Sequence, residues 1–420
     1  MDGFLREGVV VAGGNARQQF HDARGYGTPA GGNEIRLSRV EAAHLLFRGD
    51  LEAVVVDGDD PAFAGAADAG ERLDFRAFFV ASAAAGDRFA LRFLVYADLR
   101  DRGFYLSPAR GAWPGGYESA AVGGAAEPPP VDAAQSTAET DSPTADANPS
   151  PAAADTADGL RPDLLVSPRG TKPGDGEPAY RIAVVGERAS IPAADLGGRT
   201  LAVVDEESEI SYLETGAPDV DGATAYRPPD SLTGSLLEDR VVLWDAPRGL
   251  YEHGFYGQPL TAREAIVENA VQLSLVEAAG LAAGGHLTLA GDDDTADSNA
   301  ADRSSPAASL AAIRERGRAV EGERFDRRLA VYRALRDRGV VPKTGYKFGA
   351  DFRTYDTVES VEDLPHSEHL VRVVEADHVF DPRDLSLDVR LAGGVRKRMV
   401  FALTGANGEI DWLAVSRLTP

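Results

Sequence analysis

The sequence RFALRFLVYADLRDRG at residues 88–103 returns as RFDRRLAVYRALRDRG at residues 324–339, with ten of the sixteen positions identical. The same offset of 236 residues aligns Leu37–Ala43 with Leu273–Ala279. Matches at one register in two separate places are the signature of an internal repeat. The sequence therefore predicts a tandem duplication.

Each copy carries local signals for helices and strands. Ser38 and Ser274 are both followed three residues later by glutamate, the spacing of a capping box at a helix start. The repeated stretch has apolar residues at helical spacing and ends in glycine, at Gly339 in the second copy, where a helix commonly stops. Asn407-Gly408 lies between two short apolar segments, which predicts a β-hairpin. The fold class is therefore α/β (α+β), and each repeat comprises a small α/β unit, a linking helix and a second α/β unit that ends in a hairpin.

The repeats and the composition along the chain predict four units and two disordered insertions. The units are residues 1–103 (first N-terminal unit and linking helix), 104–230 (first C-terminal unit), 238–322 (second N-terminal unit) and 323–420 (second C-terminal unit). Residues of about 120–159 and about 292–309 are rich in Ala, Pro, Ser, Thr, Asp and Glu. Such segments cannot bury enough apolar surface to offset the entropy of ordering, so we expect both to be disordered.

The composition is strongly acidic and poor in lysine. The 420 residues include 67 Asp and Glu against 43 Lys and Arg, for a net charge of −24, and only four of the cations are lysine. This pattern is typical of a protein adapted to molar salt, where the Debye length is about 3 Å and acidic self-repulsion is screened. It excludes a protein that coats nucleic acid through general basicity, but it is compatible with a small local basic site.

The absence of cysteine excludes disulfides, thiolate nucleophiles and Cys-ligated zinc. No apolar run approaches the roughly 20 residues of a membrane span. We therefore expect a soluble, cytoplasmic protein with no membrane partner.

The two repeats differ in their polar residues. Lys343, Lys347 and Lys397, three of the four lysines, fall within 55 residues of the second repeat, together with Tyr355 and His366. The first repeat has no histidine from residue 45 to 252, and at the hairpin register it has Gly197 where the second has Lys397. Tyr117 lies near the place that corresponds to Tyr355. We infer that the second repeat is active and the first is a degenerate structural partner.

Tyrosine, histidine and lysine together favour one class of chemistry. A phenol, with an ordinary pKa of about 10, acts as a base where cations lower that pKa. Imidazole, near 6.5, is the natural acid at neutral pH, and an ammonium stabilises charge on a transferred phosphoryl group. Cleavage of RNA by its own 2′-hydroxyl needs these three groups and no metal or other cofactor.

Three stretches of the second repeat closely resemble archaeal tRNA-splicing endonuclease, in the two-repeat homodimeric form and of haloarchaeal type: Lys343–Tyr355, His366–Val371 and Val395–Arg398. The resemblance implies that Tyr355 is the general base, His366 the general acid and Lys397 the stabiliser of the phosphorane. It also implies cleavage of precursor tRNA at both splice sites of a bulge–helix–bulge, leaving a 2′,3′-cyclic phosphate and a 5′-hydroxyl. DNA is not an expected partner.

The resemblance carries further implications for RNA binding and assembly. An arginine at the place of Arg390 helps to clamp a flipped bulge base, and the C-terminal unit has a restriction-endonuclease-like mixed sheet. In this family an acidic loop of the non-catalytic unit inserts into a basic pocket of a catalytic unit, and here the acids Asp205, Glu206 and Glu207 lie in the first repeat. Family members often carry His-Ser before the lysine motif, where this chain has Gly393-Gly394.

Two further residues are candidates from residue type alone. Trp412 offers a face on which an unpaired base can stack, and Arg396 lies next to Lys397. We predict that both contact RNA.

Two other functions remain as alternatives. Asp351 and Asp356 could bind Mg²⁺ in a metal-dependent, restriction-like nuclease, although Glu375-Ala376-Asp377 lacks the lysine that this class carries. The chain could also be a non-catalytic RNA-binding or scaffold subunit. Cleavage in the presence of EDTA separates these possibilities.

Overall fold

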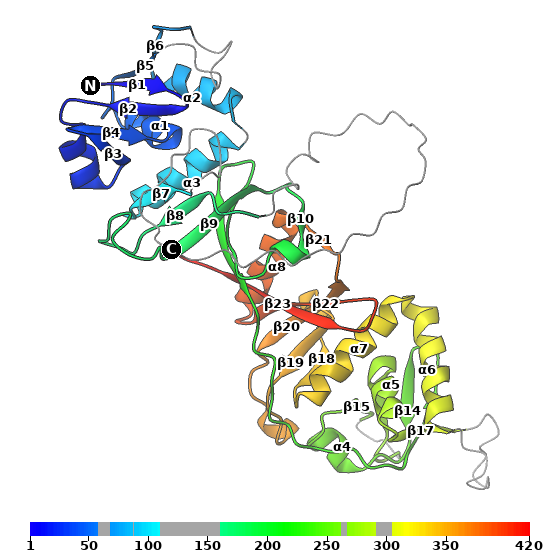
Figure 1. The fold of residues 1–420 in the computed structure, drawn as a ribbon. Coiled ribbons are helices and arrows are strands. Elements are labelled where there is room, and N and C mark those ends of the chain that lie inside the picture. Colours follow the sequence, from blue (N-terminus) through cyan, green and yellow to red (C-terminus); the bar gives the residue numbers. More distant parts are fainter. Residues whose placement is uncertain (58–67, 87, 110–159, 262–266, 291–304) are drawn as a thin grey trace, which may run out of the picture.

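The computed structural model describes residues 1–57, 68–86, 88–109, 160–261, 267–290 and 305–420. These residues form three large sheets: a six-stranded sheet at one end, a five-stranded sheet at the other and a ten-stranded sheet between them (Figure 1). The chain is therefore a mixed α/β protein, as its sequence predicts. No helix of the described part is long and apolar enough to cross a membrane.

The six-stranded sheet belongs to the start of the first repeat, with strand order β3-β4-β2-β1-β5-β6. Its strands are β1 (Asp2–Arg6), β2 (Val9–Ala12), β3 (Thr28–Gly31), β4 (Glu34–Leu37), β5 (Ala53–Val56) and β6 (Arg72–Leu73). Its helices are α1 (Arg39–Phe47) and α2 (Phe75–Ala84), after a π-helical turn at Arg17–Asp22. The predicted capping box of Ser38 is present at the start of α1.

The five-stranded sheet opens the second repeat, with strand order β15-β16-β14-β13-β17. Its strands are β13 (Leu232–Leu236), β14 (Arg240–Leu243), β15 (Gln258–Pro259), β16 (Val271–Ser274) and β17 (Leu287–Leu289). The accompanying helices are α4 (Arg248–Glu252), α5 (Leu275–Ala283) and α6 (Pro306–Glu321). Ser274 forms the predicted capping box of α5. This unit matches the first in its helix start and strand pairing, as a duplication requires.

The ten-stranded sheet joins the C-terminal units of both repeats in the order β18-β19-β20-β22-β23-β12-β11-β9-β8-β7. The first repeat supplies β7 (Leu106–Pro108), β8 (Leu164–Val166), β9 (Tyr180–Gly186), β11 (Thr200–Val204) and β12 (Ile210–Gly216). The second supplies β18 (Val341–Thr344), β19 (Phe352–Tyr355), β20 (His369–Glu375), β22 (Arg398–Thr404) and β23 (Ile410–Arg417).

Both halves of this sheet follow one pairing pattern, in which one strand pair is parallel and the other three are antiparallel. The parallel pairs are β9 with β11 and β20 with β22. The halves meet where β12 pairs antiparallel with its equivalent β23. The two C-terminal units are therefore related by an approximate twofold axis, and the sheet is continuous across it.

The repeated stretch forms equivalent helices, α3 (Phe89–Asp101) and α7 (Arg324–Asp337). Gly103 and Gly339 follow them with φ of 86° and 75°, in the left-handed region that glycine enters without strain. The helix stop predicted from these glycines is confirmed, and so is the Asn407-Gly408 hairpin between β22 and β23.

Between β20 and β22 the second repeat has an α-helix for which the described residues between β9 and β11 of the first have no counterpart. The second repeat has α8 (Pro382–Gly394), whereas the first has only a 3₁₀ turn at Ala193–Asp195. Leu385 and Val389 of α8 share a buried cluster with Leu201 and Val203 of the first repeat. The short strands β10 (Ile191–Pro192) and β21 (Val379–Phe380) also pair across the repeats. Helix α8 and strand β21 thus help to hold the two halves together.

The predicted insertions lie mostly outside the described residues, which leave out residues 110–159 and 291–304. The end of the second one was placed wrongly, because Ser305 caps α6 and Ser309 is buried. The prediction overlooked Ser305-Pro306, an N-cap followed by a first-turn proline. The division into four domains stays a prediction.

Candidate active site

Strand order brings the predicted catalytic residues to one edge of the ten-stranded sheet. Tyr355 is the last residue of β19, His366 precedes β20 by three residues, and Lys397 directly precedes β22. Because β19 runs antiparallel to β20, and β20 runs parallel to β22, the end of β19 lies beside the starts of the other two strands. Residues far apart in sequence therefore meet at this edge.

Three hydrogen bonds tie these segments together. The Glu368 amide donates to the Thr354 carbonyl at 3.0 Å, and the Arg398 amide donates to the Glu368 carbonyl at 3.1 Å. The Lys397 ammonium donates to the Ser367 carbonyl at 2.9 Å. The backbone next to Tyr355, the segment that carries His366, and Lys397 are thus held as one unit.

The Tyr355 ring is buried in a small apolar cluster with Phe255, Val341 and Val358. Phe255 meets it edge to face, with ring centroids 5.5 Å apart. Only 6% of Tyr355 is exposed, yet its hydroxyl is not fully buried and has no hydrogen-bond partner among the described residues. The ring is fixed while the reactive oxygen remains accessible.

His366 and Lys397 differ in exposure. His366 is exposed, and its imidazole has no hydrogen-bond partner in the described part of the chain, so both nitrogens are available to a substrate. Lys397 is half-buried, and burial lowers its pKa, with a further lowering from the nearby Arg353 guanidinium. Its ammonium lies 5.8 Å from the centre of the Phe348 ring, in the 3₁₀ turn at Tyr346–Phe348.

A pair of carboxyl groups lies beside these residues. Burial, followed by the charge of Glu368 and a hydrogen bond to it, raises the pKa of Asp356 to about 6. The Asp356 Oδ1 atom is buried and has no donor among the described residues. Both observations favour a proton shared between the two carboxyl groups.

A buried aspartate aligns the two C-terminal units residue by residue. Asp163 accepts a hydrogen bond from the Val184 amide at 2.7 Å, and Asp351 accepts one from the Val373 amide at 2.9 Å. Arginines of the preceding helices pair with each carboxylate: Arg88 and Arg92 with Asp163, and Arg324 and Arg328 with Asp351. The two carboxylates therefore have equivalent structural roles in the two copies.

This register identifies the first-repeat counterparts of the catalytic candidates. Ser167 lies four residues after Asp163, as Tyr355 lies four after Asp351, so these two correspond. Glu177 lies five residues before Ile182, as His366 lies five before Val371. Thr200 pairs with Ile182 as Val400 pairs with Val371, and three residues before each lie Gly197 and Lys397. The Gly197 assignment is confirmed. Tyr117 lies outside the described residues, and the strand register assigns Ser167 to the place for which Tyr117 was the sequence candidate.

The other predicted RNA contacts divide into two groups. Arg390, on α8, and Arg396, which has φ of 56° just before Lys397, are both exposed. Trp412 instead packs against the core beneath α7, pairs with Ala402, and has the Arg338 guanidinium 5.3 Å from its ring centre. Ala402 is four residues along β22 from the active edge, so the structure does not bring Trp412 to the site.

The predicted acidic loop forms the turn between β11 and β12. Asp205 is half-buried and accepts hydrogen bonds from the amides of Glu207 and Glu209, which shape the turn. Glu206 and Glu207 are exposed, and Glu206 pairs with Arg188 at 2.5 Å. The turn presents its carboxylates to solvent.

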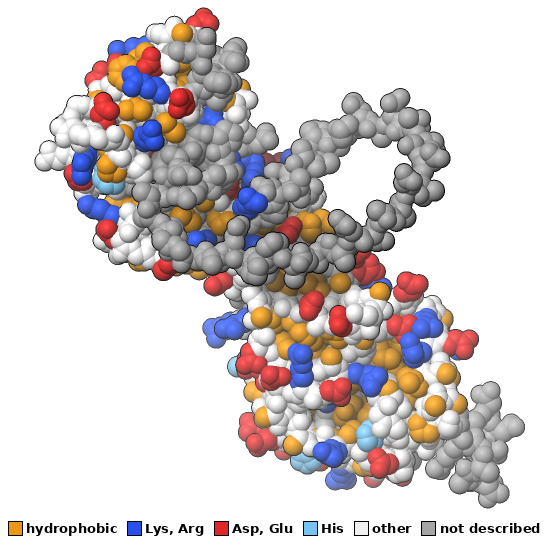
Figure 2. Space-filling view, in the orientation of Figure 1, with side chains coloured by type: hydrophobic (Ala, Val, Ile, Leu, Met, Phe, Trp, Pro, Cys, Tyr) orange, Lys and Arg blue, Asp and Glu red, His pale blue; other side chains and the backbone are white. Residues whose placement is uncertain are grey.

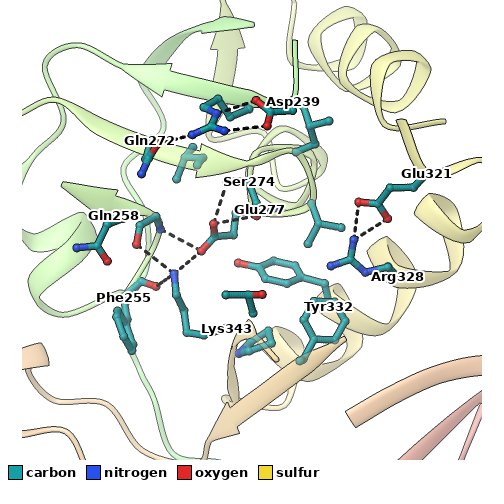
Figure 3. Close-up of a pocket in the computed structure, with 18 of the residues that line it drawn as sticks. Asp239, Phe255, Gln258, Gln272, Ser274, Glu277, Glu321, Arg328, Tyr332 and Lys343 are labelled. Atoms are coloured by element: carbon teal, nitrogen blue, oxygen red, sulfur yellow. Dashed lines mark hydrogen bonds and ion pairs between the residues drawn. The ribbon is translucent and has the colours of Figure 1, made fainter. Parts of the chain in front are cut away.

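The structure also decides the role of one lysine that the sequence grouped with Lys397. Lys343 bonds to Glu277 at 2.6 Å and to the carbonyls of Phe255 and Gly257, in a cavity of about 420 Å³ between the second N-terminal unit and the catalytic half (Figure 3). Its partner Glu277 is the capping-box residue of α5. Lys343 is therefore a structural clamp between the units.

Of the two aspartates that could bind Mg²⁺ in the metal-dependent alternative, Asp351 already has other partners. Asp351 is buried and committed to two arginines and the Val373 amide. A carboxylate that already balances two guanidinium groups is a poor ligand for Mg²⁺. The described residues also contain no group of three or more His, Asp or Glu side chains that could hold a metal ion.

Sequence reasoning missed two residues beside Tyr355. Phe255 supports its ring from the other unit, and the Arg353 guanidinium lies 5.6 Å from the ring centre. Phe255 gave no signal, because the contact crosses between units. Arg353 differs between the repeats, but only the strand register, which comes from the structure, places Leu165 at its position in the first repeat.

Comparison with known families covers both repeats. The model of the tRNA intron endonuclease catalytic C-terminal domain matches residues 325–412, and that of the N-terminal domain matches residues 1–64 and 232–299. The two matches of the N-terminal domain, one in each repeat, support the duplication.

Proteins named tRNA-splicing endonuclease match along nearly the whole chain. That of Haloferax volcanii is 48% identical over 420 residues, and that of Halobacterium salinarum is 49% identical over 421, each covering 100% of both chains. The protein of Methanosarcina acetivorans is 32% identical over 424 residues, covering 97% of both chains. The chain belongs to the tRNA intron endonuclease family.

Proposed function

We propose that this protein is a tRNA-splicing endonuclease that cuts precursor tRNA at both ends of an intron, at bulge–helix–bulge motifs, without a metal ion. The supporting observation is the meeting of Tyr355, His366 and Lys397 at one sheet edge of one repeat. Family membership gives the substrate class, and the side chains give the chemistry.

The reaction is an internal transesterification. The Tyr355 phenolate takes the proton of the 2′-hydroxyl, and the 2′-oxygen forms a bond to phosphorus. The bond between phosphorus and the 5′-oxygen then breaks, and the His366 imidazolium donates its proton to that oxygen. The products are a 2′,3′-cyclic phosphate and a 5′-hydroxyl, and no water or external reagent is consumed.

Lys397 supplies the positive charge that the reaction requires. Negative charge builds on the non-bridging oxygens as phosphorus becomes five-coordinate, and a fixed cation stabilises it. The Ser367 carbonyl holds the Lys397 ammonium but does not neutralise it, because a carbonyl carries no net charge. Arg390 and Arg396, both exposed on the same half, contact the RNA around the cut.

The active assembly is a homodimer in cytoplasm of high salt content. The exposed carboxylates of Glu206 and Glu207 in the non-catalytic half suit docking into a basic pocket of the second copy. Solution scattering in molar KCl tests this assembly: a particle of twice the 44.4 kDa chain mass supports it, and a monomer contradicts it.

The test of function is cleavage of a short bulge–helix–bulge RNA in molar KCl with EDTA, by wild type and His366→Ala. Because His366 is exposed, its loss leaves stability unchanged while the rate falls at least about 100-fold, as expected for a lost general acid. Two cuts with cyclic phosphate ends support the proposal. Cleavage only with Mg²⁺ identifies a metal-dependent nuclease, and binding without cleavage identifies a scaffold subunit.

A further inference from the structure

Arg353 is a cation without an anionic partner beside the catalytic residues. In a chain with 67 acidic residues, its guanidinium makes no ion pair or hydrogen bond among the described residues. Its Nε atom is buried and has no acceptor in that part of the chain. A buried donor without an acceptor destabilises a protein, so a group that supplies one is expected to bind here.

The position of Arg353 is next to two of the three catalytic candidates. It lies two residues before Tyr355 on β19, on the same face of the sheet, and its Cζ atom is 5.6 Å from the Tyr355 ring centre. Its charge is also close enough to Lys397 to lower the pKa of that ammonium. Arg353, on β19, and Lys397, just before β22, thus face one region.

Two other cations near Arg353 are already neutralised. Lys343, the cross-strand partner of Arg353 on β18, is paired with Glu277, and Arg328 is paired with Glu321, as Figure 3 shows. Arg353 and Lys397 have no carboxylate partner among the described residues. Two adjacent cations without a counter-charge form a site for an anion.

The first repeat lacks this site. The strand register places Leu165 at the position of Arg353 and Gly197 at that of Lys397. Both cations are therefore absent from the copy that also lacks the tyrosine and the histidine. The arginines that hold the sheet, on Asp163 and Asp351, occur in both copies, and unlike Lys343, which occurs in one copy but is paired with Glu277, Arg353 has no carboxylate partner among the described residues.

We propose that Arg353 binds the scissile phosphate together with Lys397, donating N–H groups to a non-bridging oxygen as negative charge builds there. This inference rests on the proposed endonuclease function. A guanidinium is a planar fork of donors that fits phosphate oxygens and stays charged at every working pH. Arg353 is thereby a fourth catalytic residue, and the Tyr355 ring packs against it.

The test compares three variants of Arg353 in single-turnover cleavage of the bulge–helix–bulge RNA in molar KCl. Arg353→Leu introduces the residue of the first repeat. Arg353→Gln keeps a polar side chain without charge, and Arg353→Lys keeps the charge without the planar guanidinium. We expect a rate loss of about 100-fold for the first two variants and a partial recovery for the third, as for removal of one oxyanion donor.

The matched control is Arg181→Leu. Arg181 is the exposed cross-strand neighbour of Leu165, so this variant removes one positive charge beside the first-repeat counterpart of Arg353. Its cleavage rate is expected to equal that of wild type.

A second readout separates catalysis from RNA binding and from folding. The same RNA with 2′-deoxyribose at the cut site binds but cannot react, and its Kd is expected to stay within about threefold in all variants, because molar KCl screens the single charge of the unreacted phosphate and the additional negative charge builds only during reaction. Loss of binding equal to the loss of rate would overturn the proposal. If Arg353→Leu fails to fold, Arg353→Gln decides, and a folded Arg353→Gln variant within threefold of the wild-type rate overturns it.

Failure of this inference is distinguishable from failure of the proposed function. If wild type cleaves, His366→Ala does not, and the Arg353 variants cleave normally, the endonuclease stands and the role of Arg353 is wrong. If wild type itself does not cleave this RNA without metal, the proposed function is wrong and the role of Arg353 falls with it.

Discussion

The two C-terminal units share one scaffold but only one of them has a candidate site. Both keep a buried aspartate that accepts a strand amide and balances two arginines of the preceding helix. Only the second has Tyr355, His366, Lys397 and Arg353. The comparison separates two kinds of polar residue: those retained in both copies hold the sheet, and those present in one copy gather at one sheet edge, with the structural Lys343 as an exception.

The difference extends to the supporting residues. Phe255, which backs Tyr355, has φ of 49°, and its counterpart Gly25 in the first repeat has φ of 66°. The two correspond because the amides of Gly27 and Gly257, two residues on, donate to the equivalent capping-box glutamates, Glu41 and Glu277. A left-handed phenylalanine costs about 1–2 kcal/mol that glycine avoids. The second repeat therefore carries this strain at Phe255, whose ring contacts Tyr355.

The largest expected effect comes from the shared scaffold. Asp351→Ala and Asp163→Ala each remove a buried carboxylate that pairs with two arginines, although Arg328 keeps a second carboxylate, Glu321. Removal of one partner from a buried pair costs about 3–5 kcal/mol. Urea unfolding in molar KCl is expected to show similar losses for both variants. Folded Asp163→Ala is expected to keep its cleavage rate, whereas Asp351→Ala, next to β19, is expected to lose it. Unequal stability losses would show that the aspartates are not equivalent.

A smaller effect is expected from the support of Tyr355. Phe255→Leu keeps an apolar side chain but removes an edge-to-face contact worth about 0.5–1.5 kcal/mol. With the Tyr355 ring less restrained, the cleavage rate is expected to fall about tenfold with unchanged RNA binding.

Its control is Tyr105→Leu, because the Tyr105 ring packs over Gly25 in the first repeat. That variant is expected to lose comparable stability and no activity. Equal activity losses in both would mean that general destabilisation, and not the support of Tyr355, lowers the rate.

Much of the fold could be predicted because its signals are local. The capping boxes at Ser38 and Ser274 and the turn at Asn407-Gly408 act within a few residues, and all three are present. The joining of both halves into one sheet through β12 and β23 could not be predicted, because strand pairing between repeats leaves no periodic pattern in either sequence.

The site could be predicted in part for a similar reason. Tyr355, His366 and Lys397 were found by their absence from the first repeat, which needs no structure. Arg353 follows from the same logic but requires the strand register, and alignment by a constant offset fails where the spacing between strands differs. Lys343 was misleading, since its bond to Glu277 shows a structural lysine with the same distribution as a catalytic one.

The carboxyl pair of Asp356 and Glu368 gives a pH dependence that the first repeat lacks. The raised pKa of Asp356, about 6, means that folding favours its protonated form. This contribution to stability is fully present below the ordinary pKa of about 4 and is lost as the pH rises through about 6. Asp356→Asn mimics the protonated form, so at pH 8 the variant is expected to be about 1 kcal/mol more stable, after discounting for solvent screening.

Thermal unfolding from pH 4 to pH 8 measures this effect. Asp356→Asn is expected to flatten the decline of stability between pH 4 and pH 7, while Glu359→Gln, at an exposed carboxylate three residues on, leaves the decline as it is in wild type. A parallel decline in wild type and Asp356→Asn would rule out the shared proton.

The smallest effect is expected at Trp412, where residue type and structure disagree. Its ring lies under Arg338, and its buried Nε1 donor has no acceptor among the described residues. Trp412→Phe removes that unsatisfied donor, which offsets the loss of apolar area and of part of the cation–π contact. We expect stability within about 1 kcal/mol of wild type and cleavage within twofold. A tenfold fall in cleavage at unchanged stability would instead mean that an RNA base stacks on Trp412. Residues that contact RNA would then lie beyond the active edge of the sheet, on the face that α7 covers. The division between residues that hold the sheet and residues that act on RNA would not apply to that face.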